Sequence, residues 1–348
     1  MLSLPGRTKR SRLIQQFLMN AIKAGDSEFI RHAIETFKVS RQAIFSHLKS
    51  LVNSGYLKPT GNTRARVYVL GPVRNHTAVV PLGGLDESVV YYRDFGFIFD
   101  DLPSNIESIC HFGFTEMLNN AIDHSGGTFV TIIVKRDSER INIQISDNGV
   151  GIFNHIARVF NLSDPRESLF ELHKGKLTTD PVNHTGQGIF FTSRAFDRFY
   201  IVSDDLIFSH KDGDEDDYLW HNEGKNKGTH ILMHINLESD KTLKSVFDDF
   251  TGNEEENFVF NKTVVPVKLA LYEGEKLISR SQAKRILNRV EKFKKVQLDF
   301  KGVDMIGQSF ADEIFRVFAR RNPHIQLVPV NVTEEVGRTI QAAVKGGD

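Results

Sequence analysis

The chain has 348 residues, of which 40% are hydrophobic, 25% are charged and 10% are aromatic. This balance is typical of a folded globular protein and excludes a disordered or collagen-like chain, and the length predicts two or three domains. No apolar run reaches the roughly 18 residues that a membrane-spanning helix needs, so we expect no membrane partner. The first residues lack the apolar core of a secretory signal, and the single Cys110 favours a cytoplasmic protein.

Charge is distributed unevenly along the chain. Residues 1–75 contain 13 Lys and Arg against 3 Asp and Glu, a balance of +10, whereas the remainder contains 31 against 41, a balance of −10. Such asymmetry predicts that the N-terminal part meets a polyanion. A basic arm that only improves solubility is the alternative interpretation.

Residues 1–72 are expected to form a first domain of three helices followed by two short strands. Apolar residues recur at helical spacing from Leu13 to Ile22, and Gly25 ends this helix. A second helix is expected over 28–37, and Ser40 is well placed as the N-cap of a third. The sequence YLKPTGNTRARVYVL then predicts two strands around a basic turn.

Three helices and a basic hairpin in this order resemble the winged helix-turn-helix of bacterial transcription regulators. The resemblance implies binding to double-stranded DNA, because polar and cationic side chains can reach base edges and phosphates in the major groove. The third helix presents away from its apolar stripe Arg41, Gln42, Phe45, Ser46 and Lys49. The wing would contact phosphates through Lys58, Arg64 and Arg66. A module used only for protein–protein contacts, with Phe45 in the core, is the alternative.

The rest of the chain is expected to hold two more domains and two linkers. A linker is expected over 73–84, because prolines and glycines flank or interrupt this stretch. A long helix and alternating strands are expected over 85–242, as in an α+β domain. An acidic linker is expected over 243–257. Strands alternate with helices over 258–348, which predicts a small sheet with helices packed on it.

Two motifs of the middle domain carry carboxylates. Glu116 and Asn120 are four residues apart in the predicted long helix and therefore share one face. A carboxylate can deprotonate an attacking group, and an amide oxygen can ligate Mg²⁺. Asp147 follows a strand directly and precedes Gly149 and Gly151. A carboxylate at that position can accept a hydrogen bond from the exocyclic amine of adenine, and glycines allow a tight turn with close approach of a ligand.

A third motif, TGQG, stands before a predicted helix. Its residues Gly186, Gln187 and Gly188 would expose backbone N–H groups toward a phosphate at the helix N-terminus. Each motif is weak alone, since a turn or a solvated helix face also explains it. The three in this order, however, resemble the N box, G1 box and G2 box of the GHKL ATPase superfamily, which includes gyrase, the heat-shock chaperone and histidine kinases.

This resemblance implies a Bergerat-type α+β sandwich that binds ATP and Mg²⁺. Carried over to this chain, Glu116 matches the general base, Asn120 the Mg²⁺ ligand and Asp147 the residue that reads adenine. The other matching positions are Gly149 and Gly151 in the turn beside the base, Gly186, Gln187 and Gly188 in the phosphate loop, and Thr229, which supports adenine binding. Residues 152–185 match the mobile ATP lid, where His173 and His184 would contact phosphate or be solvated. A GHKL fold without ATP binding is the alternative.

The neighbouring blocks favour one branch of this superfamily. No helical hairpin with a phosphorylated histidine precedes the ATPase motifs, and the block after 258 does not resemble the larger second domain of gyrase. The compact anti-sigma-factor serine kinases remain. The last block, with VQLDFKGVDMIGQSFADEIF, resembles STAS-like domains related to anti-sigma-factor antagonists. The resemblance implies phosphorylation of Ser309; a plain N-cap, with Asp312 and Glu313 complementing the helix dipole, is the alternative.

The sequence thus predicts a multidomain cytoplasmic protein with a winged helix-turn-helix, a GHKL ATPase domain and a STAS-like α/β domain. The first functional hypothesis is a transcription regulator that binds DNA and is switched by binding or slow hydrolysis of Mg-ATP. The second is an ATP-dependent protein serine kinase of the anti-sigma-factor type that acts on Ser309 or on a partner. The expected partners are double-stranded DNA, a protein bound by the STAS-like domain and a second copy of the chain.

Overall fold

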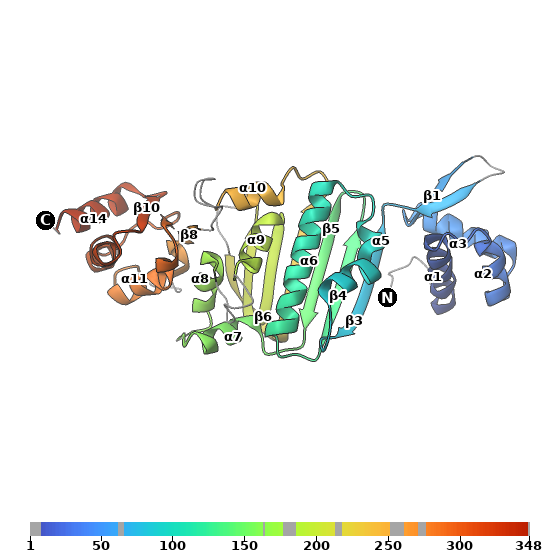
Figure 1. The fold of residues 1–348 in the computed structure, drawn as a ribbon, viewed down its shortest axis with the longest axis horizontal. Coiled ribbons are helices and arrows are strands. Elements are labelled where there is room, and N and C mark those ends of the chain that lie inside the picture. Colours follow the sequence, from blue (N-terminus) through green and yellow to red (C-terminus); the bar gives the residue numbers. More distant parts are fainter. Residues whose placement is uncertain are drawn as a thin grey trace. The chain divides into compact units, whose positions relative to one another are not determined.

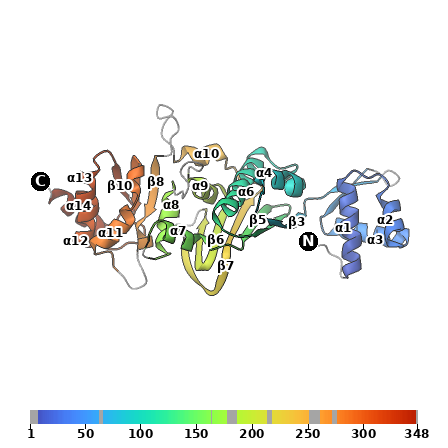
Figure 2. The same ribbon diagram turned by 60° about the horizontal axis from the view of Figure 1, so that its bottom comes forward.

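A computed structural model describes residues 8–61, 66–162, 164–176, 186–212, 218–250, 261–270 and 276–346. The chain divides into two compact units. Figures 1 and 2 show their helices and strands in two views, coloured along the sequence. The first comprises residues 1–148 and 230–240, and the second comprises residues 149–229 and 241–348. Over the described ranges, none of the helices has the length and apolar character needed to cross a bilayer.

The first unit begins with a three-helix module that has its own core. Its elements are α1 (Lys9–Lys23), α2 (Phe29–Phe37), α3 (Arg41–Asn53), β1 (Leu57–Thr60) and β2 (Val67–Leu70). The Ser40 side chain accepts from the backbone N–H of Ala43 and so caps α3, as predicted. Leu18, Leu48 and Leu51 are fully buried in the shared core. The three predicted helices and the antiparallel hairpin are therefore confirmed.

The predicted linker at 73–84 is wrong, because most of it is a strand. β3 (Arg74–Pro81) pairs antiparallel with β4 (Phe129–Arg136) along its whole length. It is the edge strand of a sheet with the order β3-β4-β5-β7-β6. An edge strand tolerates a proline at its end, and therefore Pro81 does not exclude a strand here. The prolines and glycines that suggested a linker stand around the strand instead of replacing it.

Buried polar contacts fix the start of β3 to its surroundings. The guanidinium of Arg74, whose side chain is 6% exposed, donates to the carbonyls of Gly71, Phe97 and Asp100. Next to it, Asn75 Nδ2 donates to the Tyr56 hydroxyl at 2.9 Å. The three-helix module is thus joined to the sheet by a strand and by buried hydrogen bonds, not by a flexible connection.

One face of the sheet in the first unit is covered by a long helix. After α4 (Glu87–Val90), a π-helix at Tyr91–Phe95 and α5 (Gly96–Phe99), the helix α6 (Ser104–His124) lies across β4 and β5 (Arg140–Asp147) (Figure 1). The strands alternate as predicted, with Val130, Ile132 and Val134 of β4 buried. Residues 230–236 of β7 (Tyr218–Asn236) pair antiparallel with β5.

The second unit contains the helices that lie between residues 149 and 250. They are α7 (Ile152–Val159), α8 (Glu167–Lys174), α9 (Gly188–Ala195) and α10 (Leu243–Asp248), together with β6 (Arg198–Lys211) and residues 218–229 of β7. The predicted acidic linker at 243–257 is therefore wrong over α10, which begins with a capping box formed by Thr242 and Ser245. Residues 251–260 lie outside the described residues.

The C-terminal part of the second unit is a small parallel sheet with helices. Its strands β8 (Lys262–Pro266), β9 (Lys295–Asp299) and β10 (Gln326–Val330) are ordered β10-β9-β8. The connecting helical segments are Val267–Ala270, α11 (Arg280–Leu287), Val290–Lys292, α12 (Gln308–Asp312), a π-helix at Glu313–Phe318, α13 (Ala319–Arg321) and α14 (Glu334–Lys345). This arrangement confirms the predicted α/β character of the last block.

Candidate nucleotide site

Glu116 and Asn120 lie on α6 in the first unit. Both side chains are half-buried, while Met117, Leu118 and Ala121 between and beside them are buried against the sheet. One helical turn separates the carboxylate from the amide, so the predicted shared face is present. The pair therefore stands at the border between the buried face of α6 and its accessible side.

Asp147 ends β5 and is only 7% exposed. The next residue, Asn148, fixes the turn that follows: its Oδ1 accepts from the backbone N–H groups of Thr128 at 2.8 Å and Phe129 at 3.1 Å. Its Nδ2 donates to the Thr128 hydroxyl at 3.0 Å. Sequence reasoning missed this structural role of Asn148, although an asparagine at a strand end is a typical turn residue.

The second unit brings Gly151 and Thr229 together. Gly151 has φ of +84°, and a Cβ there would lie 2.5 Å from Ser203 Oγ and 2.9 Å from Asp204 Oδ2, so a side chain has no room. Thr229 Oγ1 accepts from the backbone N–H of Ile152 at 3.0 Å. This hydrogen bond to Thr229 therefore holds the glycine turn, which starts at Gly149, against β7.

The TGQG motif lies at the start of α9. Gly186 has φ of +70°, Gln187 is the N-cap residue without a capping side-chain hydrogen bond, and Gly188 is the first helical residue. The first N–H groups of a helix have no partner within it and favour an anion. Thr185 and His184 lie outside the described residues.

The segment that corresponds to the lid contains α7 and α8. His173 on α8 is 6% exposed, and its Nε2 lies 3.5 Å from Nη2 of Arg194 on α9. The interpretation of His173 as a solvated lid residue is therefore wrong. The physical reason is packing, because α8 lies between α9 and the C-terminal sheet and not at a free surface.

The residue types at these positions fit ATP with Mg²⁺. Over the described residues, no group of three or more His, Cys, Asp or Glu could hold a metal ion. The amide oxygen of Asn120 is a type of ligand that Mg²⁺ accepts beside phosphate oxygens. The buried Asp147 carboxylate can accept a hydrogen bond, and the backbone N–H groups that follow Gly186 can donate to an anion.

Comparison with known families finds matches to two parts of the chain. The family model of the histidine kinase-, DNA gyrase B- and HSP90-like ATPases matches residues 107–239. The chain contains a GHKL-type ATPase domain. A second family, described as a STAS-like domain of unknown function, matches residues 282–336. A search of the curated proteins found no match to the chain.

Upstream of the GHKL-type domain, the three-helix module exposes the side chains predicted to meet DNA. On α3 the exposed residues are Arg41, Gln42, Phe45, Ser46 and Lys49. Phe45 is 40% exposed beside the Arg41 guanidinium, so the alternative that placed Phe45 in the core is wrong. Lys58 and Arg66 are exposed on the hairpin, and Arg64 lies outside the described residues.

In the STAS-like domain, Ser309 is exposed and is the second residue of α12. The N-cap is Gly307, so the interpretation of Ser309 as an N-cap is wrong. Asp312 does more than complement the helix dipole, because its carboxylate pairs with Arg316 and Arg280. The hydrogen bond from Arg316 keeps the pKa of Asp312 below its usual value. Glu313 is buried instead of exposed to solvent.

Proposed function

We propose that this chain is an ATP-switched regulator that binds double-stranded DNA through α3 and the β1–β2 hairpin. The observation that carries the proposal is the exposed polar and cationic set on α3 and the hairpin, in one chain with a GHKL-type ATPase domain. Such side chains supply both phosphate contacts and base contacts. The buried joint at Arg74 and Asn75 supports the coupling of the two modules, because strand β3 leads directly from the hairpin into the sheet.

In this proposal each site residue has one task. Asp147 accepts a hydrogen bond from the adenine amine, the N–H groups after Gly186 bind phosphate, and Asn120 ligates the cation. Bound Mg²⁺ supplies charge neutralisation at the phosphates. Glu116 removes a proton from the attacking water. Gly151 keeps the turn clear of any side chain, since a Cβ would meet Ser203.

Replacing Arg66 by alanine is expected to weaken binding to all duplex sequences alike and to lower the salt slope by about 1, if Arg66 contacts one phosphate. Replacing Arg41 by alanine should instead change sequence preference, by about 1–3 kcal/mol at the base it reads. Both effects are measured with the full chain by fluorescence anisotropy over a range of salt concentrations. Arg320, which is exposed in the STAS-like domain, provides the matched control Arg320→Ala.

Two results would contradict this part of the proposal. One is a full chain that ignores duplex DNA at low salt, which would leave the three-helix module as a protein–protein module. The other is an equal loss of affinity in Arg66→Ala and Arg320→Ala, because a general charge effect does not locate the interface.

The second candidate function is a protein serine kinase, which the exposure of Ser309 favours. Incubation with Mg-ATP should add one phosphate to the chain, detected by intact mass spectrometry, and Ser309→Ala should abolish the addition. The gained charge of about −1.5 to −2 lies near a helix N-terminus, where the dipole stabilises it. Ser281→Ala, which removes another exposed serine of the same domain, is the control. An unchanged mass despite ATP binding would leave the domain as an interaction module.

A further inference from the structure

Within the second unit, the end of helix α8 and the residues after it are linked to the STAS-like domain by hydrogen bonds from side chains to backbone carbonyl groups. Thr263 Oγ1, on β8, donates to the carbonyl of Lys174 at 2.8 Å. In return, Lys174 Nζ donates to the carbonyl of Asn288 at 2.5 Å. Beyond the helix end, Lys176 Nζ donates to the carbonyl of Lys292 at 2.9 Å. Two segments that lie far apart in the sequence, by 89 to 116 residues, are thereby held together at three places.

Charged side chains are buried in this contact. The side chain of Lys174 is 1% exposed and that of Glu171 is 3% exposed, and Nζ lies 3.1 Å from Oε1. The other carboxylate oxygen of Glu171 lies 3.1 Å from Nε of Arg289 in the STAS-like domain. Burial lowers the pKa of Lys174, and the nearby Glu171 opposes that shift. We name Glu171, Lys174, Thr263, Asn288 and Arg289 the lid clamp.

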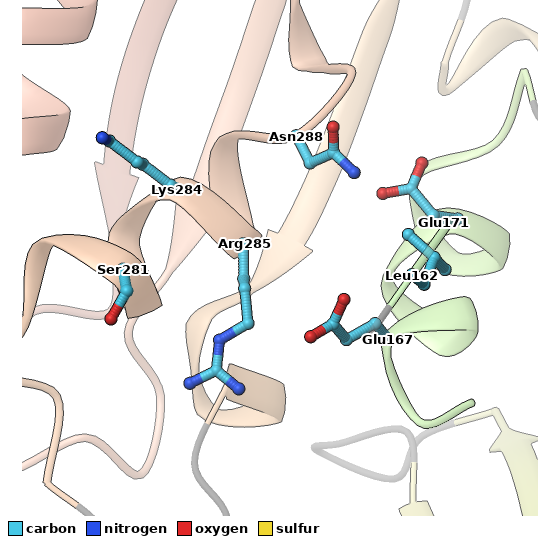
Figure 3. Close-up of a pocket in the computed structure, with 7 residues that line it drawn as sticks. All are labelled: Leu162, Glu167, Glu171, Ser281, Lys284, Arg285 and Asn288. Carbon is cyan, nitrogen blue, oxygen red and sulfur yellow. The ribbon is translucent and has the colours of Figure 1, made fainter. Parts of the chain in front are cut away.

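Beside the lid clamp, the two sides carry opposite charges. Figure 3 shows a cavity between α8 and the region of α11, in which Glu167 and Glu171 face Arg285 and Asn288. Removing one member of a buried ion pair leaves an uncompensated charge, which is strongly unfavourable. Separation of α8 from the STAS-like domain would take Arg289 away from Glu171, whereas Lys174 and Glu171, both on α8, would stay together. The lid clamp is therefore specific for one docked arrangement.

Helix α8 also contacts α9, the helix that follows the TGQG motif. His173, the neighbour of Lys174, contacts Arg194 of α9, and Arg194 in turn lies 3.8 Å from the ring centroid of Phe190 and donates to its carbonyl. Helix α9 starts at Gly188 of the TGQG motif. One turn of α8 thus connects β8 of the STAS-like domain with the helix that would bind phosphate.

We infer that the STAS-like domain pre-orders α8, the part of the ATP lid that the lid clamp holds, and thereby raises ATP affinity. The inference rests on the proposed ATP binding. A lid that must be ordered on binding costs conformational entropy, and a lid that is already ordered avoids this cost. Because coupling between two sites is reciprocal, a partner that draws the STAS-like domain off α8 lowers ATP affinity by the same factor by which ATP weakens that partner.

The first measurement is hydrogen exchange of the full chain without nucleotide. Arg289→Ala removes one cation of the lid clamp, and the double variant Glu171→Gln with Lys174→Met removes both charges of the buried pair, which also takes from Arg289 its carboxylate partner. Both should speed exchange over 167–176 by about tenfold or more, because local opening becomes easier. Lys292→Ala is the control, since its side chain is exposed and its carbonyl still accepts from Lys176. Unchanged exchange in both clamp variants would overturn the inference.

The second measurement is ATP affinity of the same proteins by calorimetry. The clamp variants should raise the Kd for Mg-ATP by about 5- to 150-fold, the usual range of allosteric coupling, while Lys292→Ala keeps the wild-type value. Faster exchange with unchanged or tighter ATP binding would overturn pre-ordering. A wild-type chain that binds no ATP would refute the proposed function and the inference with it, whereas exchange would still show whether the lid clamp exists.

Discussion

Replacing Glu116 by alanine is expected to lower ATP turnover by about 10²–10⁴-fold, the usual contribution of a general base. The affinity for ATP should change little, because in the proposed mechanism the carboxylate acts on the attacking water and not on the nucleotide. The measurement combines phosphate release under saturating Mg-ATP with a calorimetric Kd. Glu107→Ala is the matched control, since Glu107 is an exposed carboxylate in the first turn of the same helix.

The outcome separates two roles of Glu116, and the wild-type chain tests the enzyme itself. Loss of turnover alone supports a base, whereas an equal loss of turnover and affinity indicates that the residue supports the structure of α6. A wild-type chain without phosphate release and without phosphoryl transfer would reject the enzyme and leave a switch that responds to nucleotide binding alone.

Replacing Asp147 by asparagine should weaken ATP binding by about 10- to 150-fold, which corresponds to the roughly 1.5–3 kcal/mol of a hydrogen bond to a charged group. The change replaces a carboxylate, which only accepts hydrogen bonds, by an amide, which both donates and accepts them. Asp147 is only 7% exposed, so water cannot readily compensate. Calorimetry with ATP and with GTP provides the measurement, because only the adenine base carries the exocyclic amine at that position. The loss should therefore be larger for ATP than for GTP.

Asp240→Asn serves as the control for this variant, since Asp240 is exposed at the end of the first unit. Retention of the wild-type ATP affinity by Asp147→Asn would show that the G1-box assignment is wrong. An equal loss for both nucleotides would show that Asp147 supports the fold without reading the base.

Local signals explain which parts of the fold could be predicted from the sequence. The apolar spacing and the cap at Ser40 predicted α3, and both depend only on neighbouring residues. The glycine motifs predicted turns, and the structure places Gly151 and Gly186 at positive φ. The family match over 107–239 agrees with the order of the motifs.

Features that depend on distant partners could not be predicted in this way. Strand β3 is stabilised by β4, which follows only after α6, and its short apolar run between prolines does not differ from a linker. The charged residues of α8 are typical of a solvated helix. Lys174 is nevertheless buried, and its Nζ donates to the carbonyl of Asn288, which lies 114 residues away in the sequence. Periodicity does not report such contacts, because it describes only the segment in which it occurs.

The strand β3 also limits how this chain can be recombined with others. Transplanting residues 1–72 from a related protein, in order to exchange the proposed DNA specificity, would separate Tyr56 from Asn75 and Gly71 from Arg74. Deletion of residues 1–81 would instead remove β3 and leave the edge of β4 without its neighbour. Such an edge, with a row of unsatisfied N–H and C=O groups, is a template for aggregation. In a functional chimera, the three-helix module and the edge strand β3 must therefore come from the same parent protein.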